Sequence, residues 1–331
     1  MNIKRLIIIS ASVLVALFAV SCKEDDPESL PYLEGVPTFY LPAFGLPGET
    51  FTFKSAGCFP DREDEKTVVH YYWMASPVVT DRDTTDVFSF TLPDDLCRVT
   101  VTCSSFAEGY YGTTTSKEIV VISADRENGS IKGKPFDPQK DYVFTDPRDG
   151  HEYWCTTIGG LDWFKENLSW LGAGYTLQEC EETAGLFGNY YTWEEAMTAC
   201  PDGWRVSSRQ DWVDAAKAAT GQDFGLDDNM YDIAGHFMGN ISFNGERMWD
   251  YWPGVRITDD LGLSLMPVGY AVIGDQATFK SMYNYSVLWT SDDNGDDAYY
   301  RYIYVERPDF MIGCTGKTSF GASVRCVRDH Q

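Results

Sequence analysis

Residues 35–123 consist of short runs in which β-branched and aromatic residues alternate with polar ones. Gly, Pro or Asp turns bound these runs, and no helical period intervenes. This pattern restricts the fold more than any other feature of the chain, because it predicts an all-β sandwich of short strands. The expected strands are Thr50 to Lys54, Val68 to Trp73, Val87 to Leu92, Cys97 to Ser104 and Lys117 to Ile122.

The cysteines of this region refine the prediction. Cys58 closes one expected strand, Trp73 lies in a central strand, and Cys103 lies in a late one. This order resembles the Cys, Trp, Cys arrangement of immunoglobulin-type domains, which implies an immunoglobulin-like sandwich with a Cys58–Cys103 pair. Cys97 is an alternative partner, because the spacing from Cys58 to Cys103 is shorter than usual. We expect this domain to act as a spacer or stalk, with ligand binding at its loops as the alternative.

A polar stretch that contains Gly and Pro, residues 124–140, marks the expected domain boundary. The residues beyond it, 141–331, predict an α+β domain with few helices and much irregular structure. The dipeptide Asp149-Gly150 favours a β-hairpin near its start. Capping boxes that begin at Thr192 and at Ser208 predict two helices.

The first 22 residues have the pattern of an export signal. Lys4 and Arg5 precede an apolar run of 15 residues, Leu6 to Val20, which leads into Ser21 and Cys22. This pattern resembles a bacterial lipoprotein signal, which implies cleavage before Cys22 and a diacylglycerol on its sulfur. An ordinary secretory signal is one alternative. A retained transmembrane anchor is another, although the run is shorter than the roughly 20 residues that a spanning helix needs.

The acidic residues that follow Cys22 resemble the signal that sends lipoproteins of Bacteroidota-type bacteria to the outer face of the outer membrane. We therefore expect a protein tied to the outer membrane through its N-terminal lipid and exposed on the outer face, with periplasmic exposure as the alternative. The expected layout is a signal peptide at 1–21, a flexible tether at 22–34, the sandwich at 35–123, the linker at 124–140 and the second domain at 141–331.

The charge and the cysteine count limit the possible partners. The formal charge of the chain is −24, and loss of Lys4 and Arg5 with the signal changes it to −26. A chain this acidic excludes nucleic acid as a general electrostatic partner, and anionic lipid head groups would repel it. Eight cysteines remain once Cys22 is lipidated, an even number that permits disulfides in an exported protein. The sequence contains no CxxC pair, which argues against structural zinc, and no Gly-rich phosphate loop.

A series of motifs stands in order between residues 140 and 330. They are Asp146 to Gly150, Glu166 to Leu168, Tyr191 to Trp204, Trp289 to Ser291 and Ser323 to Arg328. Together they resemble the Fibrobacter succinogenes major paralogous domain. The chain departs from the family pattern at Val206-Ser207, where Leu-Pro is usual, and at Cys155 and Cys180.

That family is similar to the C-type lectin-like fold. The resemblance therefore implies an α+β C-type lectin-like domain, in which a cysteine of the first helix is tied to one of the last strand. Carried over to this chain, it pairs Cys200 with Cys326 in a structural disulfide that brings the ends of the domain together.

An acidic segment, residues 291–297, is a candidate metal site. Calcium takes six to eight oxygen ligands from flexible acidic loops, so the composition suits it. The spacing of an EF-hand is absent, and a solvated turn between two strands is the alternative. The candidate ligands are Asp292, Asp293, Asn294, Asp296 and Asp297.

The tryptophans divide into core and candidate binding residues. Those in the family motifs, such as Trp204 and Trp289, are expected in the core. We predict that Trp249, Tyr251 and Trp252, in a Gly- and Asp-rich region, stack on a sugar or a protein partner. Arg325 and Arg328 are expected to pair with structural carboxylates.

These observations predict a lipid-anchored, non-enzymatic surface protein whose distal domain binds an extracellular glycan or protein. The alternative is a structural subunit of a cell-surface assembly. A further alternative is an enzyme related to the formylglycine-generating enzymes, which share the C-type lectin-like fold, although a disulfide-bonded Cys326 could not serve their chemistry. We predict no catalytic residue, and no cofactor other than possible calcium.

Overall fold

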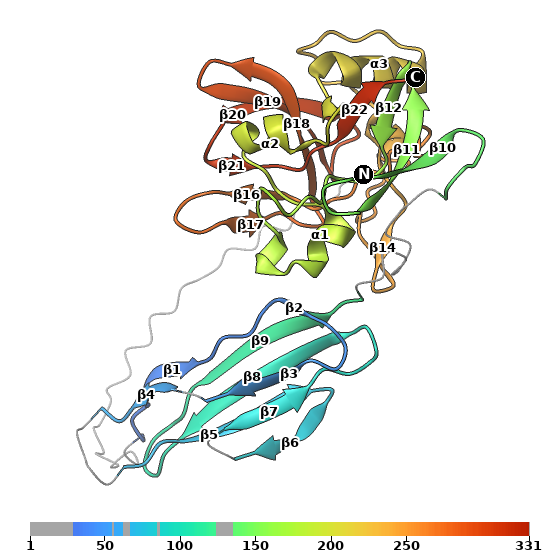
Figure 1. Ribbon diagram of the computed structural model, residues 1–331. Coiled ribbons are helices and arrows are strands. Elements are labelled where there is room, and N and C mark those ends of the chain that lie inside the picture. The colour runs from blue at the N-terminus through green and yellow to red at the C-terminus, as the bar shows by residue number, and fades with distance from the viewer. Residues whose placement is uncertain (1–28, 55, 62–66, 85–86, 124–134, 331) are drawn as a thin grey trace, which may run out of the picture.

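The structure, a computed structural model, describes residues 29–330 except 55, 62–66, 85–86 and 124–134. The predicted signal peptide, Cys22 and most of the predicted linker lie outside the described residues. Strands hold 41% of the residues and helices hold 11%. The chain is multidomain and rich in β-structure, as predicted, with an N-terminal unit and a larger C-terminal unit at opposite ends of the molecule (Figure 1).

The N-terminal unit packs a five-stranded sheet against a strand pair. The order of the large sheet is β2-β9-β8-β5-β6, and β3 pairs with β7. A further pair, β1 and β4, lies at one end. The bounds are β1 Glu34–Thr38, β2 Phe44–Gly45, β3 Thr50–Phe53, β4 Ala56–Phe59, β5 His70–Ser76, β6 Val79–Asp83, β7 Phe88–Thr91, β8 Arg98–Phe106 and β9 Thr114–Val121.

Strand alternation builds the core of this unit. In β8 the side chains of Val99, Val101 and Cys103 are fully buried, whereas the residues between them face outward. Trp73 of β5 is also fully buried and stacks on Phe88 of β7, with ring centroids 5.3 Å apart. The two layers are therefore joined by aromatic packing.

The predicted Cys58–Cys103 disulfide is wrong. Cys58 is a free thiol whose Sγ lies 3.6 Å from Thr113 Oγ1. The reason is that β4 pairs with β1 instead of joining the large sheet, so Cys58 packs beside Leu33 and Ala107, apart from the main core that holds Cys103. Leu33 is itself buried and hydrogen-bonded to Tyr111, so the last residues of the predicted tether belong to the sandwich.

The C-terminal unit, which we call the head, contains three larger sheets and one short hairpin. Their orders are β10-β11-β12-β22-β13, β18-β19-β20, β17-β16-β21 and β14-β15. The bounds are β10 Asp141–Thr145, β11 Glu152–Ile158, β12 Leu161–Phe164, β13 Arg205–Val206, β14 Ser242–Phe243, β15 Glu246–Arg247, β16 Tyr270–Val272, β17 Thr278–Lys280, β18 Tyr285–Asn294, β19 Asp297–Tyr304, β20 Phe310–Gly316, β21 Phe320–Gly321 and β22 Cys326–Asp329.

Within its described residues, the head also has three α-helices and two 3₁₀ turns. They are α1 Glu182–Phe187, α2 Trp193–Ala199, α3 Arg209–Thr220, η2 Leu177–Glu179 and η3 Ala234–His236. Both predicted capping boxes are present, at Thr192 before α2 and at Ser208 before α3. The predicted hairpin around Asp149-Gly150 joins β10 to β11. Within the described residues, no helix is long and apolar enough to cross a membrane.

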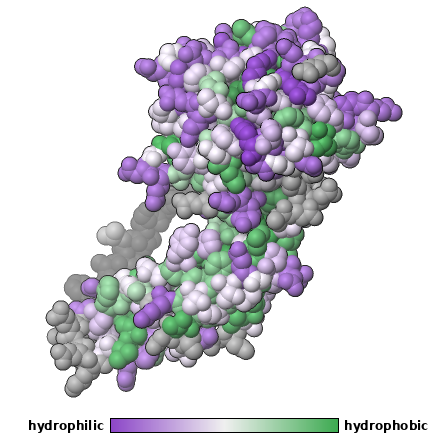
Figure 2. Space-filling view, viewed as in Figure 1, coloured by the Kyte–Doolittle hydropathy of each residue, from purple (hydrophilic) through white to green (hydrophobic). Residues whose placement is uncertain are grey.

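The two units touch through the β14–β15 hairpin, which lies close to the sandwich in Figure 1. Ile122, just after β9, is fully buried in the core cluster of the head. The Asn244 side chain donates a hydrogen bond of 2.8 Å to the carbonyl oxygen of Val121. Arg98 Nη2 lies 3.8 Å from Glu246 Oε2, an exposed ion pair of small energetic weight. The surface of the head is mainly hydrophilic, whereas hydrophobic colour gathers on the sandwich (Figure 2).

Candidate functional site

A cleft of about 370 Å³ opens on the surface of the head between strands of two different sheets. We call it the tyrosine cleft. Its walls come from β16, β18, β19 and β21, which bring together residues up to 50 positions apart in the sequence. The lining residues are Tyr270, Ser281, Tyr285, Val287, Tyr300, Tyr302 and Phe320.

The alternation of side chains in β18 and β19 places the rings on one face. Tyr300 and Tyr302 are two residues apart in β19, and the register sets Tyr302 opposite Val287 and Tyr300 opposite Trp289. Gly313 of β20 lies across from Tyr300. A Cβ atom there would come within 2.3 Å of Tyr300 Cζ, so only glycine lets the tyrosine ring lie over the neighbouring strand.

The rings form a continuous aromatic surface. Phe320 stacks on Tyr270 at 5.1 Å and on Tyr300 at 5.4 Å between centroids. Trp289 is fully buried and meets Phe320 edge-on at 5.6 Å. Its Nε1 donates a hydrogen bond of 2.7 Å to the carbonyl oxygen of Tyr191, which fixes the indole ring. Trp289 is thus a core residue, as the sequence predicts, and supports the rings at the surface.

The hydroxyl groups of the cleft are available to a ligand. Within the described part of the chain, the hydroxyls of Tyr270, Tyr285, Tyr300 and Tyr302 make no hydrogen bond to protein. Burial raises the pKa of Tyr285 and Tyr300 above the usual value, so both hydroxyls stay neutral at physiological pH. No charged residue is among those that line the cleft. Flat rings with neutral hydroxyls suit a ligand that has both apolar C–H faces and hydrogen-bonding groups.

The residues predicted to stack on a ligand lie elsewhere. Trp249 is fully buried, and its Nε1 donates a hydrogen bond of 2.9 Å to the carbonyl oxygen of Leu265. It is therefore a core residue, and its predicted stacking role is excluded because no ring face reaches solvent. Tyr251 is 74% exposed and Trp252 is 40% exposed, but neither lines the tyrosine cleft. A binding role for these two stays a prediction.

The acidic segment forms the tip of the β18–β19 hairpin, where Gly295 has a φ of +70°. Asp292 accepts a hydrogen bond of 2.7 Å from the backbone N–H of Arg209, and Asp293 lies 3.2 Å from Lys317 Nζ. Among the residues that the structure describes, no group of three or more His, Cys, Asp or Glu side chains is placed to hold a metal ion. Calcium binding by Asp292, Asp293, Asn294, Asp296 and Asp297 stays a prediction, which a calcium titration of the melting temperature would test.

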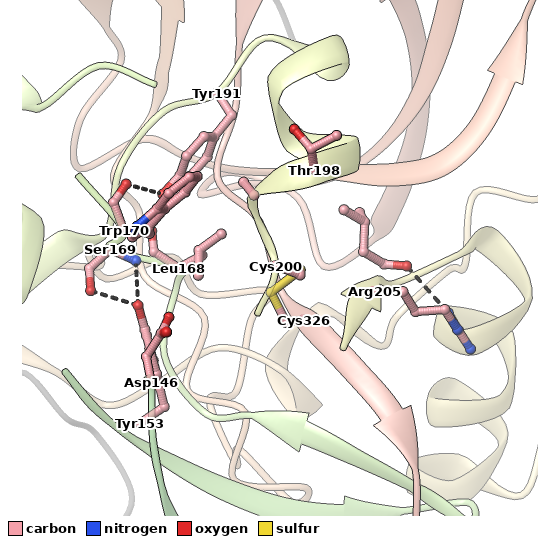
Figure 3. The surroundings of a disulfide bond; sticks show 12 residues. Asp146, Tyr153, Leu168, Ser169, Trp170, Tyr191, Thr198, Cys200, Arg205 and Cys326 are labelled. Carbon is pink, nitrogen blue, oxygen red and sulfur yellow. Dashed lines mark hydrogen bonds between the residues drawn. A yellow bond between two sulfur atoms is a disulfide. The ribbon is translucent and has the colours of Figure 1, made fainter. Parts of the chain in front are cut away.

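The predicted Cys200–Cys326 disulfide is confirmed. It ties the C-terminal end of α2 to β22, the strand that lies between β12 and β13 (Figure 3). Nearby, Tyr153 Oη and Ser169 Oγ are hydrogen-bonded at 2.9 Å, which holds the loop after β12 in place. The disulfide therefore fixes the framework of the head and takes no part in the cleft.

The two arginines near the end of the head differ in their partners. Arg328 pairs with Asp162 at 3.2 Å, as predicted, and its guanidinium lies over the Trp204 ring. Arg325 is fully buried and donates to the carbonyl oxygens of Phe164 and Leu263 instead of to a carboxylate. Burial lowers the pKa of Arg325 to about 9. The charge of Asp259 partly offsets the effect of burial on Arg325, so a carboxylate acts on this side chain through its charge, and both arginines are structural.

Sequence reasoning did not identify the tyrosine cleft. One signal was present, because tyrosines at 300, 302 and 304 occupy alternate positions of one strand. The contribution of Tyr270 and Phe320 carries no such signal, since only the pairing of β16 with β21 brings these two rings together.

A sequence profile of the Fibrobacter succinogenes major domain matches residues 156–328, just over half of the chain. The chain belongs to this family. The match covers the tyrosine cleft, both cysteines of the disulfide and the whole of the β18–β20 sheet. The family membership thus agrees with the motifs that the sequence shows.

Comparisons with curated proteins and with solved structures do not identify a function. No curated protein matches the chain. Among solved structures, the chain is similar to a quinonprotein alcohol dehydrogenase-like protein from Bacteroides thetaiotaomicron, with 16% identity over 37% of this chain and a TM-score of 0.21. The match spans 24% of that protein. A likeness this weak indicates neither a shared fold nor a shared activity.

Proposed function

We propose that this protein is a lipid-anchored, non-enzymatic protein of the outer membrane, exposed on the outer face, and that its head binds an extracellular glycan in the tyrosine cleft. In this proposal the sandwich is an immunoglobulin-like spacer and the head is a C-type lectin-like domain. The N-terminal leader and Cys22 support the anchor, and the order of the units along the chain places the head after the sandwich.

The tyrosine cleft is the observation that carries the glycan proposal. Sugar rings present apolar C–H faces with hydroxyl groups around the edge. The Tyr300, Tyr302 and Phe320 rings offer a surface on which such a face can stack, and the unpaired tyrosine hydroxyls can donate to or accept from sugar hydroxyls. The absence of charge in the lining favours a neutral glycan over an acidic one.

A glycan-array screen of the protein without its lipid, followed by calorimetry on the best ligand, tests this proposal. Tyr302→Ala should weaken binding by about five- to thirtyfold, because truncation of an aromatic contact residue costs about 1–2 kcal/mol. Tyr251→Ala is the matched control, since Tyr251 is an exposed tyrosine outside the cleft. Unchanged affinity in Tyr302→Ala together with a loss in Tyr251→Ala would move the site to the Tyr251 region.

The alternative of an assembly subunit has a separate signature. If the array is silent for every glycan while the protein forms concentration-dependent oligomers, the head contacts protein and the glycan proposal fails. Analytical ultracentrifugation of the same preparation provides that measurement.

A further inference from the structure

The strand directions define an end of the sandwich that faces away from the head. Arg98 at the start of β8 and Val121 at the end of β9 lie at the end that contacts the head. The end of β8 and the start of β9 therefore lie at the opposite end. The start of β5 joins them there, because His70 pairs with Phe106. The start of β1 and the end of β4 meet at the same end, since Tyr32 bridges to Tyr111 beside them.

Large apolar side chains are exposed at this far end, which we call the apolar pole. Phe59 is 57% exposed and Val36 is 51% exposed, on the paired strands β4 and β1. The Tyr32 and Tyr111 rings lie 5.2 Å apart and both are exposed. Figure 2 shows hydrophobic colour on this unit, including the end away from the head. Among the described residues, the exposed apolar side chains that we assign to the pole are Leu30, Tyr32, Val36, Phe59, Val68, Phe106 and Tyr111.

A gathering of exposed aromatic and aliphatic side chains on one end of a domain marks an interaction surface. Each square ångström of apolar surface taken out of water contributes about 25 cal/mol. Tyrosine, with an apolar ring and a polar hydroxyl, suits the boundary between lipid head groups and acyl chains. The pole carries carboxylates as well, on Glu34, Asp61 and Glu108, so a zwitterionic lipid surface suits it better than an anionic one.

The short distance along the chain from Cys22 to the sandwich indicates which surface the pole contacts. Ser29, the first described residue, precedes the Tyr32–Tyr111 bridge and hence lies near the pole. Cys22 stands seven residues earlier, and seven residues reach at most about 25 Å. A lipid on Cys22 would keep the pole within that distance of the bilayer. Such a tether raises the effective concentration of the surface, so even a weak apolar contact becomes populated.

We propose that the apolar pole rests on the bilayer, with Val36, Phe59 and the Tyr32–Tyr111 pair in the interfacial region of a zwitterionic lipid surface. This inference rests on the lipid anchor of the proposed function. It adds an orientation, because a docked pole directs the head and its tyrosine cleft away from the membrane.

Quenching of an added tryptophan tests the inference. The lipidated full chain is reconstituted into phosphatidylcholine vesicles whose acyl chains carry bromine, a quencher that acts only at short range. The fluorescence of the added tryptophan is the emission of the variant minus that of the parent protein. In Phe59→Trp, and separately in Tyr111→Trp, we expect the brominated lipid to quench this difference. Val143→Trp, at an exposed apolar position of the head, is the control and should keep its added emission.

Four results would overturn the inference. Equal quenching at the pole and at position 143 would mean that the protein has no preferred orientation. No quenching at the pole in a protein that floats with the vesicles would remove the docking and leave the anchor intact. A protein that does not float lacks the anchor itself, and the docking fails with it. If the protein forms oligomers in the absence of lipid and these shield the added pole tryptophans from solvent, the pole binds a second copy of the chain and not the bilayer.

Discussion

The rings of Tyr300 and Tyr302 pack against each other at the surface of the head. Their hydroxyls make no hydrogen bond to the described protein residues. This separation means that one side chain can be tested for stability and for binding independently. The ring contributes packing with its neighbours, whereas the hydroxyl contributes only what a ligand uses. Few residues of the head allow such a clean division, because most buried tyrosines, such as Tyr190, donate to backbone carbonyls.

The Tyr302→Phe substitution removes one such hydroxyl. The free energy of unfolding should change by less than about 0.5 kcal/mol, since no protein hydrogen bond is lost. Glycan affinity should fall by about three- to tenfold, the equivalent of one hydrogen bond of about 0.5–1.5 kcal/mol. Urea unfolding and calorimetry measure the two quantities. Equal loss in Tyr251→Phe would show that the effect is unrelated to the cleft.

Asp162 predicts how the head responds to acid. Burial disfavours its carboxylate, but hydrogen bonds from Tyr142, His330, Thr157 and Arg328 outweigh burial and lower its pKa. Because the folded pKa lies below the unfolded value of about 3.9, this stabilisation is present above that value and is lost as the pH falls through the folded pKa. Thermal unfolding between pH 6 and pH 2 should show this loss.

The Asp162→Asn variant is the test of that assignment. It should be less stable at pH 7 by about 1.5–3 kcal/mol, the range for hydrogen bonds to a charged group. Its melting temperature should also fall less steeply below pH 4 than that of the parent. If the melting temperature of the variant falls with pH as steeply as that of the parent, other carboxylates cause the acid sensitivity. Asp146 is one candidate, because hydrogen bonds from Arg148 lower its pKa against the effect of burial.

At the scale of elements, patterns within a few residues of each other predicted helix starts and a hairpin correctly. Pairings between strands far apart in the sequence could not be predicted. The capping boxes at Thr192 and Ser208 and the hairpin around Gly150 depend on residues within a few positions of each other. The cleft depends on the pairing of β16 with β21 across about 50 residues, and no local pattern specifies it. The Cys58–Cys103 prediction failed for the same reason, because it assumed a position for β4 that strand pairing alone decides.

The Cys200–Cys326 disulfide joins two elements that are 126 residues apart. Its removal in Cys326→Ser should lower the free energy of unfolding by about 2–5 kcal/mol. Cys314→Ser removes an exposed free thiol and should leave stability unchanged. Urea unfolding with and without reductant checks both variants. A parent protein that is insensitive to reductant would contradict the stabilising role.

At the scale of the whole molecule, the two units are in direct contact and are not joined by the linker alone. Ile122 lies in the core of the head although it follows a strand of the sandwich, and Asn244 of the head bonds to the sandwich backbone. Such a contact couples the two units more firmly than a linker alone. We expect this contact to limit how far the head can turn relative to the sandwich, which matters if the pole is fixed on a membrane.

The Ile122→Asp substitution should break this coupling, because it places a charge in a fully buried apolar cluster. We expect a larger radius of gyration in small-angle X-ray scattering and two separate thermal transitions in place of one. Val120→Asp is unsuitable as a control because Val120 packs against the same cluster. Val143→Asp, at an exposed site of the head, should leave both observations unchanged.

The place of β22 has a consequence for how the head is made. This strand lies inside its sheet, between β12 and the edge strand β13, yet it is the last strand of the head to be synthesised. Until it is available, β12 and β13 have no partner between them and Cys200 has no Cys326 to bond. The five-stranded sheet can therefore be completed only after the last strand of the head is available.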